Sequence, residues 1–269
     1  MKVTGEELKR GRLSAEALET AQMHLKIKGY VVLEGVLSEA TLRTIKVRFD
    51  ELLEEFASVT DPNRGASRYG MPLPFEAPFA TEELVANPVV LQLVRAVLGE
   101  NIVCSYLASD TPLPGSSYQH AHSDVAPLFP EKDIALPPFA YVVNVPLVDF
   151  RPDNGPLEIW PYGTHLIPDA DLTPTADFTD VQQRLTSPLG RMAEEMGGQQ
   201  LLASAGSVVI RDLRMWHRGT PNRSDGPRPM IAMVLNRAWY HHGTVEIDTA
   251  AFDALPDEVR TLFRTAVLR

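Results

Sequence analysis

The spacing of hydrophobic residues changes at about residue 101, and this change limits the possible folds more than any other feature of the chain. Before it, apolar residues recur every three or four positions, as in amphipathic helices. After it, short apolar segments alternate with turns rich in proline, glycine and aspartate, as in antiparallel strands. Helices followed by many short strands favour a β-sandwich or jelly roll with helices packed outside.

Helices are expected at about residues 4–28, 38–57 and 81–98, the last broken or restarted near Pro88, and a short one near the C-terminus. Strands are expected at about residues 29–33, 101–108, 139–148, 157–160, 207–211 and 229–239. The segments 61–78 and 125–138 are expected to be loops, and 166–200 an insertion that is partly helical, at about 178–196.

The length of 269 residues suits one large domain, expected over residues 1–269, with a helical part to about residue 100 and a jelly-roll core over about 101–240. The net charge of −10 argues against a nucleic-acid partner, because phosphate contacts need a basic surface. No apolar run suits a signal peptide or a membrane span, so no membrane partner is expected. The lone Cys104 fits a reducing cytoplasm. A small molecule is the expected ligand.

One short segment, residues 118–124, places two histidines and an aspartate at alternate positions. If this segment is extended, His120, His122 and Asp124 point to the same side. His122 and Asp124 could then hold two neighbouring positions around a metal ion, with His217 as the third ligand. Two histidines and one carboxylate on one face of the metal leave the opposite positions open, as in non-haem Fe(II) oxygenases. His120 is interpreted as a residue of the surrounding pocket.

Three longer motifs include these residues or lie between them. They are Gln119-x-x-His122-x-Asp124, the segment Asn-Gly-Pro-Leu to Pro-Tyr-Gly-Thr-His at 154–165, and Trp-His-Arg-Gly at 216–219 with Arg228 placed 11 residues after the histidine. Together with Gly-Tyr-Val-Val-Leu at 29–33, they resemble the motifs of the phytanoyl-CoA dioxygenase-like Fe(II)/2-oxoglutarate oxygenases. The resemblance covers roughly residues 25–240.

This resemblance implies a double-stranded β-helix, a cupin-like jelly roll, and an oxygenase that most often hydroxylates its substrate. It implies that His122, Asp124 and His217 hold Fe(II), and that 2-oxoglutarate and O2 are co-substrates. Related halogenases carry a small residue in place of the carboxylate, so Asp124 argues against halogenation. A natural-product substrate is expected.

The resemblance also suggests which residues contact 2-oxoglutarate. Arg228 would bind its distal carboxylate, because a guanidinium can donate two parallel hydrogen bonds to a carboxylate. Gln119 and Thr164 are further candidates. Gln119 lies an odd number of residues from His122, so its role requires a bend in the chain near residues 115–118.

Two alternatives stay open from the sequence. One is a cupin-type metalloenzyme that does not use 2-oxoglutarate and binds its metal through His120, His122 and a later glutamate. The nearest following glutamate, Glu131, is too far along the chain for the usual spacing. The other is a non-catalytic binding protein on the same scaffold.

Arginine is concentrated between residues 206 and 240, where the sequence has six arginines and only two aspartates. One of these arginines, Arg228, is assigned to 2-oxoglutarate. The others could attract an anionic substrate, but surface ion pairs are common and weak. The simpler expectation is that they pair with acidic groups elsewhere on the surface.

Overall fold

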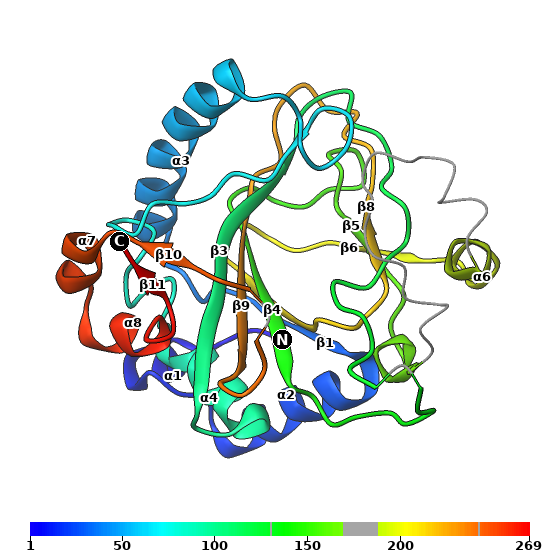
Figure 1. Ribbon diagram of the computed structural model, residues 1–269, viewed down its shortest axis with the longest axis horizontal. Helices are drawn as coiled ribbons and strands as arrows, with labels where there is room; N and C mark the ends of the chain where they lie inside the picture. The colour runs from blue at the N-terminus through cyan, green and yellow to red at the C-terminus, as the bar shows by residue number, and fades with distance from the viewer. Residues whose placement is uncertain (130, 169–187, 242) are drawn as a thin grey trace.

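Two antiparallel β-sheets form the centre of the fold (Figure 1). The computed structural model describes residues 1–129, 131–168, 188–241 and 243–269. The larger sheet has six strands in the order β1-β7-β4-β9-β3-β2, and the smaller has three in the order β6-β5-β8. Strands remote in sequence therefore pair, which is the topology of a jelly roll. The predicted fold class, mainly β with a jelly-roll core and flanking helices, is confirmed.

The strands of the two sheets are short except at the centre of the larger one. Their bounds are β1 Tyr30–Leu33, β2 Arg68–Tyr69, β3 Ile102–Pro112, β4 Ala140–Pro146, β5 Leu157–Ile159, β6 Gln199–Leu201, β7 Val208–Asp212, β8 His217–Gly219 and β9 Met230–Arg237. A separate parallel pair joins β10 (Glu246–Ile247) to β11 (Val267–Leu268).

The helices lie outside the six-stranded sheet, on the side away from the smaller sheet (Figure 1). They are α1 Gly5–Arg10, α2 Ala15–Lys28, α3 Glu39–Val59, α4 Pro88–Leu98, α7 Thr249–Ala254 and α8 Asp257–Leu262. Helix α6 (Pro188–Met196) and the 3-10 turn η1 (Thr164–Leu166) belong instead to the region of the smaller sheet. Among the described residues, no helix is long and apolar enough to cross a membrane.

The expected helical character of residues 4–28 is confirmed, and the chain forms two helices there. Gly11 takes a left-handed conformation with φ 62° and ends α1, and Ser14 then caps α2. The predicted restart near Pro88 is correct, and the side chain of Asn87 caps α4. Part of the expected insertion helix, residues 178–187, lies outside the described residues.

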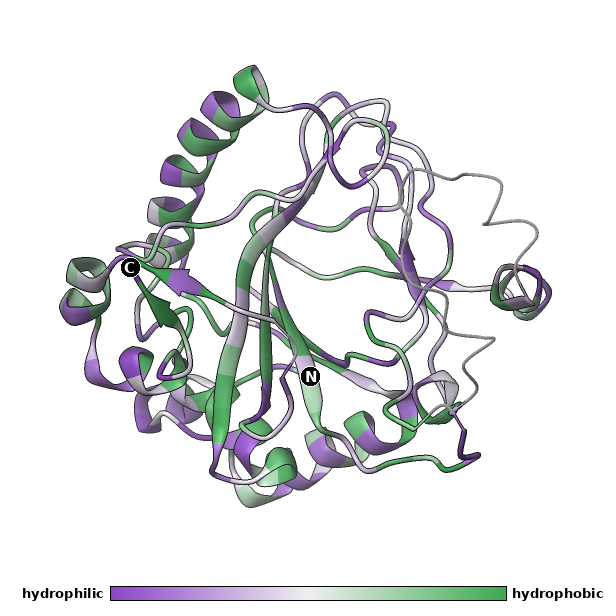
Figure 2. Cartoon of the chain, in the orientation of Figure 1, coloured by the Kyte–Doolittle hydropathy of each residue, from purple (hydrophilic) through white to green (hydrophobic). Residues whose placement is uncertain are grey.

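Side-chain alternation along the central strands separates a hydrophobic core from an inner cavity. On β4, Tyr141 and Val143 pack in the core shared with the helices, whereas Val142 and Asn144 line the cavity toward the smaller sheet. Figure 2 shows the central strands as mainly hydrophobic and α3 with both kinds of residue around its turns. The same alternation on β7 turns Arg211 toward the cavity.

Candidate metal centre and its cavity

Backbone hydrogen bonds hold His122 and His217 side by side. The N–H of each residue donates to the carbonyl of the other, both at 2.9 Å, so the pair forms an antiparallel bridge at the start of β8. The N–H of Asp124 donates to Leu213 O at 3.1 Å. The chain around His122 is therefore extended as expected, and the two imidazole centroids lie 4.3 Å apart.

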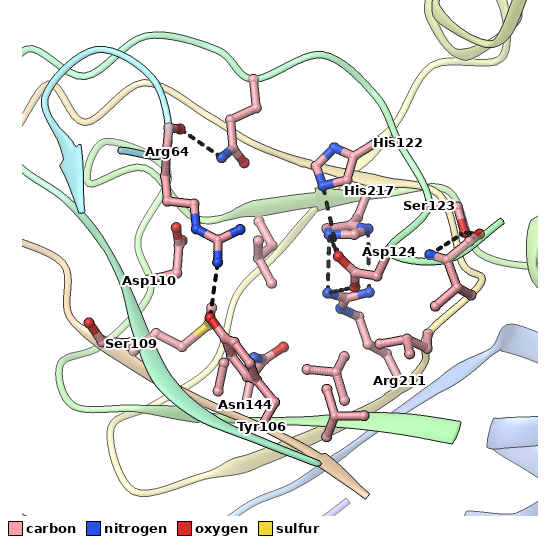
Figure 3. Close-up of a pocket in the computed structure, with 18 of the residues that line it drawn as sticks. Arg64, Tyr106, Ser109, Asp110, His122, Ser123, Asp124, Asn144, Arg211 and His217 are labelled. Atoms are coloured by element: carbon pink, nitrogen blue, oxygen red, sulfur yellow. Dashed lines mark hydrogen bonds and ion pairs between the residues drawn. The ribbon is translucent and has the colours of Figure 1, made fainter. Parts of the chain in front are cut away.

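Both imidazoles direct Nε2 toward the Asp124 carboxylate (Figure 3). Nδ1 of His122 lies 2.8 Å from His120 O, and Nδ1 of His217 lies 3.1 Å from Met215 O. A proton on each Nδ1 satisfies these carbonyls and leaves the lone pair on Nε2. The Nε2 atoms of His122 and His217 lie 3.9 and 3.5 Å from Asp124 Oδ1.

These three atoms have the spacing that a metal ion needs. The ligand atoms of His122, Asp124 and His217 all lie within 4.8 Å of one another. Metal–nitrogen bonds of about 2.1 Å at a right angle would place neighbouring ligand atoms about 3 Å apart, so a bound metal would draw each Nε2 atom and Asp124 Oδ1 together by about 0.5–1 Å. The donor set is the two-histidine, one-carboxylate triad.

Electrostatics favour the protonation states that metal ligands require. Burial lowers the pKa of His122, although Asp124 opposes the shift. Burial and the charge of Arg211 lower the pKa of His217 well below its ordinary value. Burial raises the pKa of Asp124, but its contacts with His217 and Arg211 outweigh this and lower it overall. At neutral pH the imidazoles are therefore neutral and the carboxylate is ionised.

Metal-free protein is expected to lose stability as the pH falls from 7.5 to 5.5. Above about pH 6.5, His122 and His217 are neutral in both the folded and the unfolded protein. Below it, both histidines take up protons in the unfolded chain but stay neutral in the folded protein. Each such histidine costs up to about 1.4 kcal/mol per pH unit. Urea unfolding in a chelator at both pH values measures this, and His122→Asn with His217→Asn should flatten the dependence. Equal stability at both pH values would contradict the buried neutral histidines.

Arg211 also belongs to this site, although no sequence motif indicated it. Its Nη2 lies 2.8 Å from Asp124 Oδ2 and 3.1 Å from Nε2 of His217, and its Nη1 lies 3.3 Å from Nδ1 of His217. Arg211 is only 4% exposed. The expectation that such arginines pair at the surface is wrong here. The sequence signal that could have identified Arg211 was a charged residue at the end of the apolar segment Ser-Val-Val-Ile-Arg.

Arg228, the predicted partner of 2-oxoglutarate, lies fully buried behind Asp110. Its Nε donates to Gly155 O at 3.1 Å, and its Nη2 lies 3.3 Å from Asp110 Oδ2, which Arg68 also contacts at 2.9 Å. Nη1 of Arg228 is buried and has no hydrogen-bond partner among the described residues. Burial lowers the pKa of Arg228 to about 10, which leaves it charged at neutral pH.

A cavity of about 360 Å³ opens beside the triad, between the two sheets. Asp110 lines it, whereas Arg228 is not among its described lining residues. Figure 3 shows Arg64 and Asp110 on one side of this cavity and the histidines with Arg211 on the other. Besides these charged groups, its lining includes polar side chains (Tyr106, Ser109, Asn144) and apolar ones (Val142, Leu157, Met230).

The loop before β2 is built to direct Arg64 into the cavity. A Cβ on Gly70 would lie 2.6 Å from Nε of Arg64, so glycine gives this side chain its space. Nη2 of Arg64 donates to the Tyr106 hydroxyl at 3.0 Å. Gln119 fastens the loop, because its amide donates to Arg64 O at 3.0 Å and accepts from the N–H of Gly219 at 2.8 Å.

The other predicted site residues differ in outcome. Gln119 lines the cavity, but both ends of its amide bond the protein backbone. Thr164 is not among the described lining residues. Its hydroxyl donates to Trp160 O and accepts from the N–H of Trp216 at 3.3 Å, and its contact with 2-oxoglutarate stays a prediction. The ring of His120 lies 5.2 Å from that of His122.

The geometry does not support the cupin-type ligand set. Within the described part of the chain, the potential ligands that come together are His122, Asp124 and His217. Neither His120 nor Glu131 belongs to this group.

Fold and site together define a jelly-roll protein with a two-histidine, one-carboxylate centre at the wall of its inner cavity. The model of the phytanoyl-CoA dioxygenase (PhyH) family matches residues 25–230, and the chain belongs to this family. The family predicted from the sequence motifs is thereby confirmed.

Individual relatives agree with this assignment. The chain is 27% identical over 217 residues to dioxygenase af480 of Aspergillus fumigatus, a match that covers 76% of this chain and 62% of the relative, less than two thirds of its length. Among solved structures, SnoN, a non-haem α-ketoglutarate-dependent epimerase from nogalamycin biosynthesis, has a TM-score of 0.59 at 19% identity, covering 84% of this chain and 82% of SnoN. EctD from S. alaskensis, solved with 2-oxoglutarate and 5-hydroxyectoine, has a TM-score of 0.57 at 19% identity, covering 88% and 79%. These two structures share the fold.

Proposed function

We propose that this protein is a non-haem Fe(II)- and 2-oxoglutarate-dependent dioxygenase that hydroxylates a small molecule. The observation that carries the proposal is the convergence of two Nε2 atoms and one carboxylate oxygen at the wall of a cavity. Family membership supports it. When bound, iron with 2-oxoglutarate and O2 supplies the oxidising power for attack on a C–H bond.

The protein's own residues hold and orient the reactants. His122, His217 and Oδ1 of Asp124 would hold the metal at the wall of the cavity. The buried Nη1 of Arg228 is a charged donor that suits the distal carboxylate of 2-oxoglutarate. Gln119 acts indirectly, because it fastens the Arg64 loop to β8 and so closes one side of the cavity.

The substrate is a small molecule, and we assign it to natural-product metabolism. The cavity volume of about 360 Å³ must hold both the co-substrate and the reacting part of the substrate. The similarity to SnoN of nogalamycin biosynthesis supports a natural-product substrate. The net charge of −10 disfavours a nucleic acid.

Cys104 is buried with its pKa raised to about 12, so it stays an unreactive thiol, which suits the cytoplasm.

Oxygen-free addition of Fe(II) and 2-oxoglutarate tests the proposal. The complex is expected to show a weak metal-to-ligand charge-transfer absorption in the visible region. His122→Ala should lose this absorption, whereas His241→Ala, at an exposed histidine, should keep it. Coupled release of succinate and a product heavier by one oxygen atom then identify hydroxylation.

Two results would overturn the proposal in different ways. Iron bound through the triad without the absorption would indicate a metalloenzyme that does not use 2-oxoglutarate. Wild-type protein that binds no iron would indicate a non-catalytic binding protein on this scaffold.

A further inference from the structure

Arg211 touches two of the three proposed metal ligands and is itself buried. Its Nη2 contacts Asp124 Oδ2 at 2.8 Å, while Oδ1 of the same carboxylate faces the two histidine Nε2 atoms. The two oxygens of Asp124 therefore have different neighbours. One faces the metal position and the other is held by a guanidinium.

The fold fixes this contact from a rigid element. Arg211 lies in β7, between β1 and β4 in the six-stranded sheet, and pairs in register with Tyr30 and Val142. Val209, two residues earlier, points to the same side. With its backbone on a central strand, Arg211 can keep its contact with Oδ2 of Asp124 when a metal binds at Oδ1, whereas its 3.1 Å contact with Nε2 of His217 would give way to the metal.

We propose that Arg211 is a positioning residue of the iron centre that limits Asp124 to binding the metal through Oδ1 alone and serves as the buried counter-charge of this carboxylate. This inference rests on the proposed function. Two consequences follow, and they have opposite signs. Arg211 weakens metal binding, because it repels a divalent cation and occupies Oδ2. It strengthens 2-oxoglutarate binding, because it keeps a coordination position open and adds positive charge beside a dianion.

The variant Arg211→Met separates this role from a merely structural one. Without the guanidinium, Asp124 can offer both oxygens to the metal and loses a competing cation. Mn(II), titrated in the absence of 2-oxoglutarate, is expected to bind roughly tenfold more tightly. The affinity of the metal-loaded protein for 2-oxoglutarate is expected to fall roughly tenfold. A residue that only supports the fold would, when removed, weaken both.

Stability measurements give a second readout that needs no turnover. The metal-free Arg211→Met protein should melt at a lower temperature than wild type, because the partly buried carboxylate of Asp124 loses its cationic partner. Addition of Mn(II) should raise its melting temperature more than it raises that of wild type. Arg214→Met is the matched control, since Arg214 lies on the same segment but pairs with Asp212. It should lower stability equally with and without metal.

Two further variants keep the test decisive. If Arg211→Met fails to fold, Arg211→Lys, which keeps the charge with a single donor, should bind Mn(II) within about threefold of wild type. In metal-free protein, a double-mutant cycle of Arg211→Met and Asp124→Asn should show strong coupling between the two residues. Weaker or unchanged Mn(II) binding by Arg211→Met would overturn the inference. Failure of wild-type protein to bind Mn(II) or Fe(II) would instead overturn the proposed function, while the metal-free cycle would still test the ion pair.

Discussion

Replacing Asp124 with alanine is expected to abolish turnover and to weaken iron binding more than either histidine-to-alanine substitution does. The change removes the only anionic ligand of the triad and also leaves the buried guanidinium of Arg211 without its 2.8 Å partner. The positive charge of Arg211 then repels the metal from His217. One unit charge at about 4 Å contributes about 4 kcal/mol at an effective dielectric constant of 20, so Fe(II) affinity should fall on the order of a thousandfold.

Anaerobic Fe(II) titration followed by succinate release measures this effect. Asp153→Ala is a suitable control, because Asp153 forms an exposed ion pair with Arg151. The double variant Asp124→Ala with Arg211→Met should recover part of the metal affinity, since it removes the repelling charge. Affinity within tenfold of wild type in the single variant would mean that Asp124 does not bind the metal.

The triad was predictable from the sequence because its geometry follows from local rules. Side chains two residues apart on an extended segment point to the same side, and this rule placed His122 and Asp124 together. His217 needed the motif as well, because nothing in local spacing pairs residues so far apart in the chain. In the structure a backbone bridge between His122 and His217 accomplishes this.

The buried arginines were not predictable in the same way. An arginine in a strand can face solvent or cavity, and both faces of β7 are buried, so alternation alone gives no answer. The partner of Arg211 is 87 residues away, and the partner of Arg228, Asp110, is 118 residues away. Such contacts depend on sheet topology, which the sequence indicated only as a class.

Local signals were also missed or misinterpreted. The N-terminal helix divides at Gly11, which the apolar spacing did not reveal, although Thr4 and Glu7 already form a capping box for a short helix. The hydrogen bonds of Thr164 were not predictable either, because its neighbourhood is a turn. Tyr162 takes a positive φ of 66°, and the chain then folds back so that the Thr164 hydroxyl bonds the backbone.

Asp110 lies at the end of the cavity where the distal carboxylate of 2-oxoglutarate is proposed to bind. Its carboxylate already accepts hydrogen bonds from Arg68 and Arg228, two arginines with almost no exposed surface. Burial raises the pKa of Asp110, but Arg68 and Arg228 outweigh this and lower it overall, so the group is ionised at neutral pH. An incoming carboxylate therefore meets a cluster whose positive charge is already partly neutralised.

Substitutions at Arg228 and Asp110 are accordingly expected to change 2-oxoglutarate affinity in opposite directions. Arg228→Met removes the buried donor Nη1 and should weaken binding about a hundredfold, the effect of losing a strong charge-assisted pair. Asp110→Asn keeps the shape but removes the competing charge, so Arg68 and Arg228 can attract the co-substrate more strongly, and binding should tighten several-fold.

The charge-transfer absorption of Fe(II)-loaded protein, titrated with 2-oxoglutarate, measures both dissociation constants, with Asp153→Asn as the surface control. Asp110→Asn should also lower the free energy of unfolding, because two buried arginines lose their anionic partner. Tighter co-substrate binding in a less stable protein would identify Asp110 as a residue that stabilises the fold at the expense of co-substrate affinity. Weaker binding in both variants would instead mean that Asp110 orients Arg228 for the co-substrate, and the competition argument would fail.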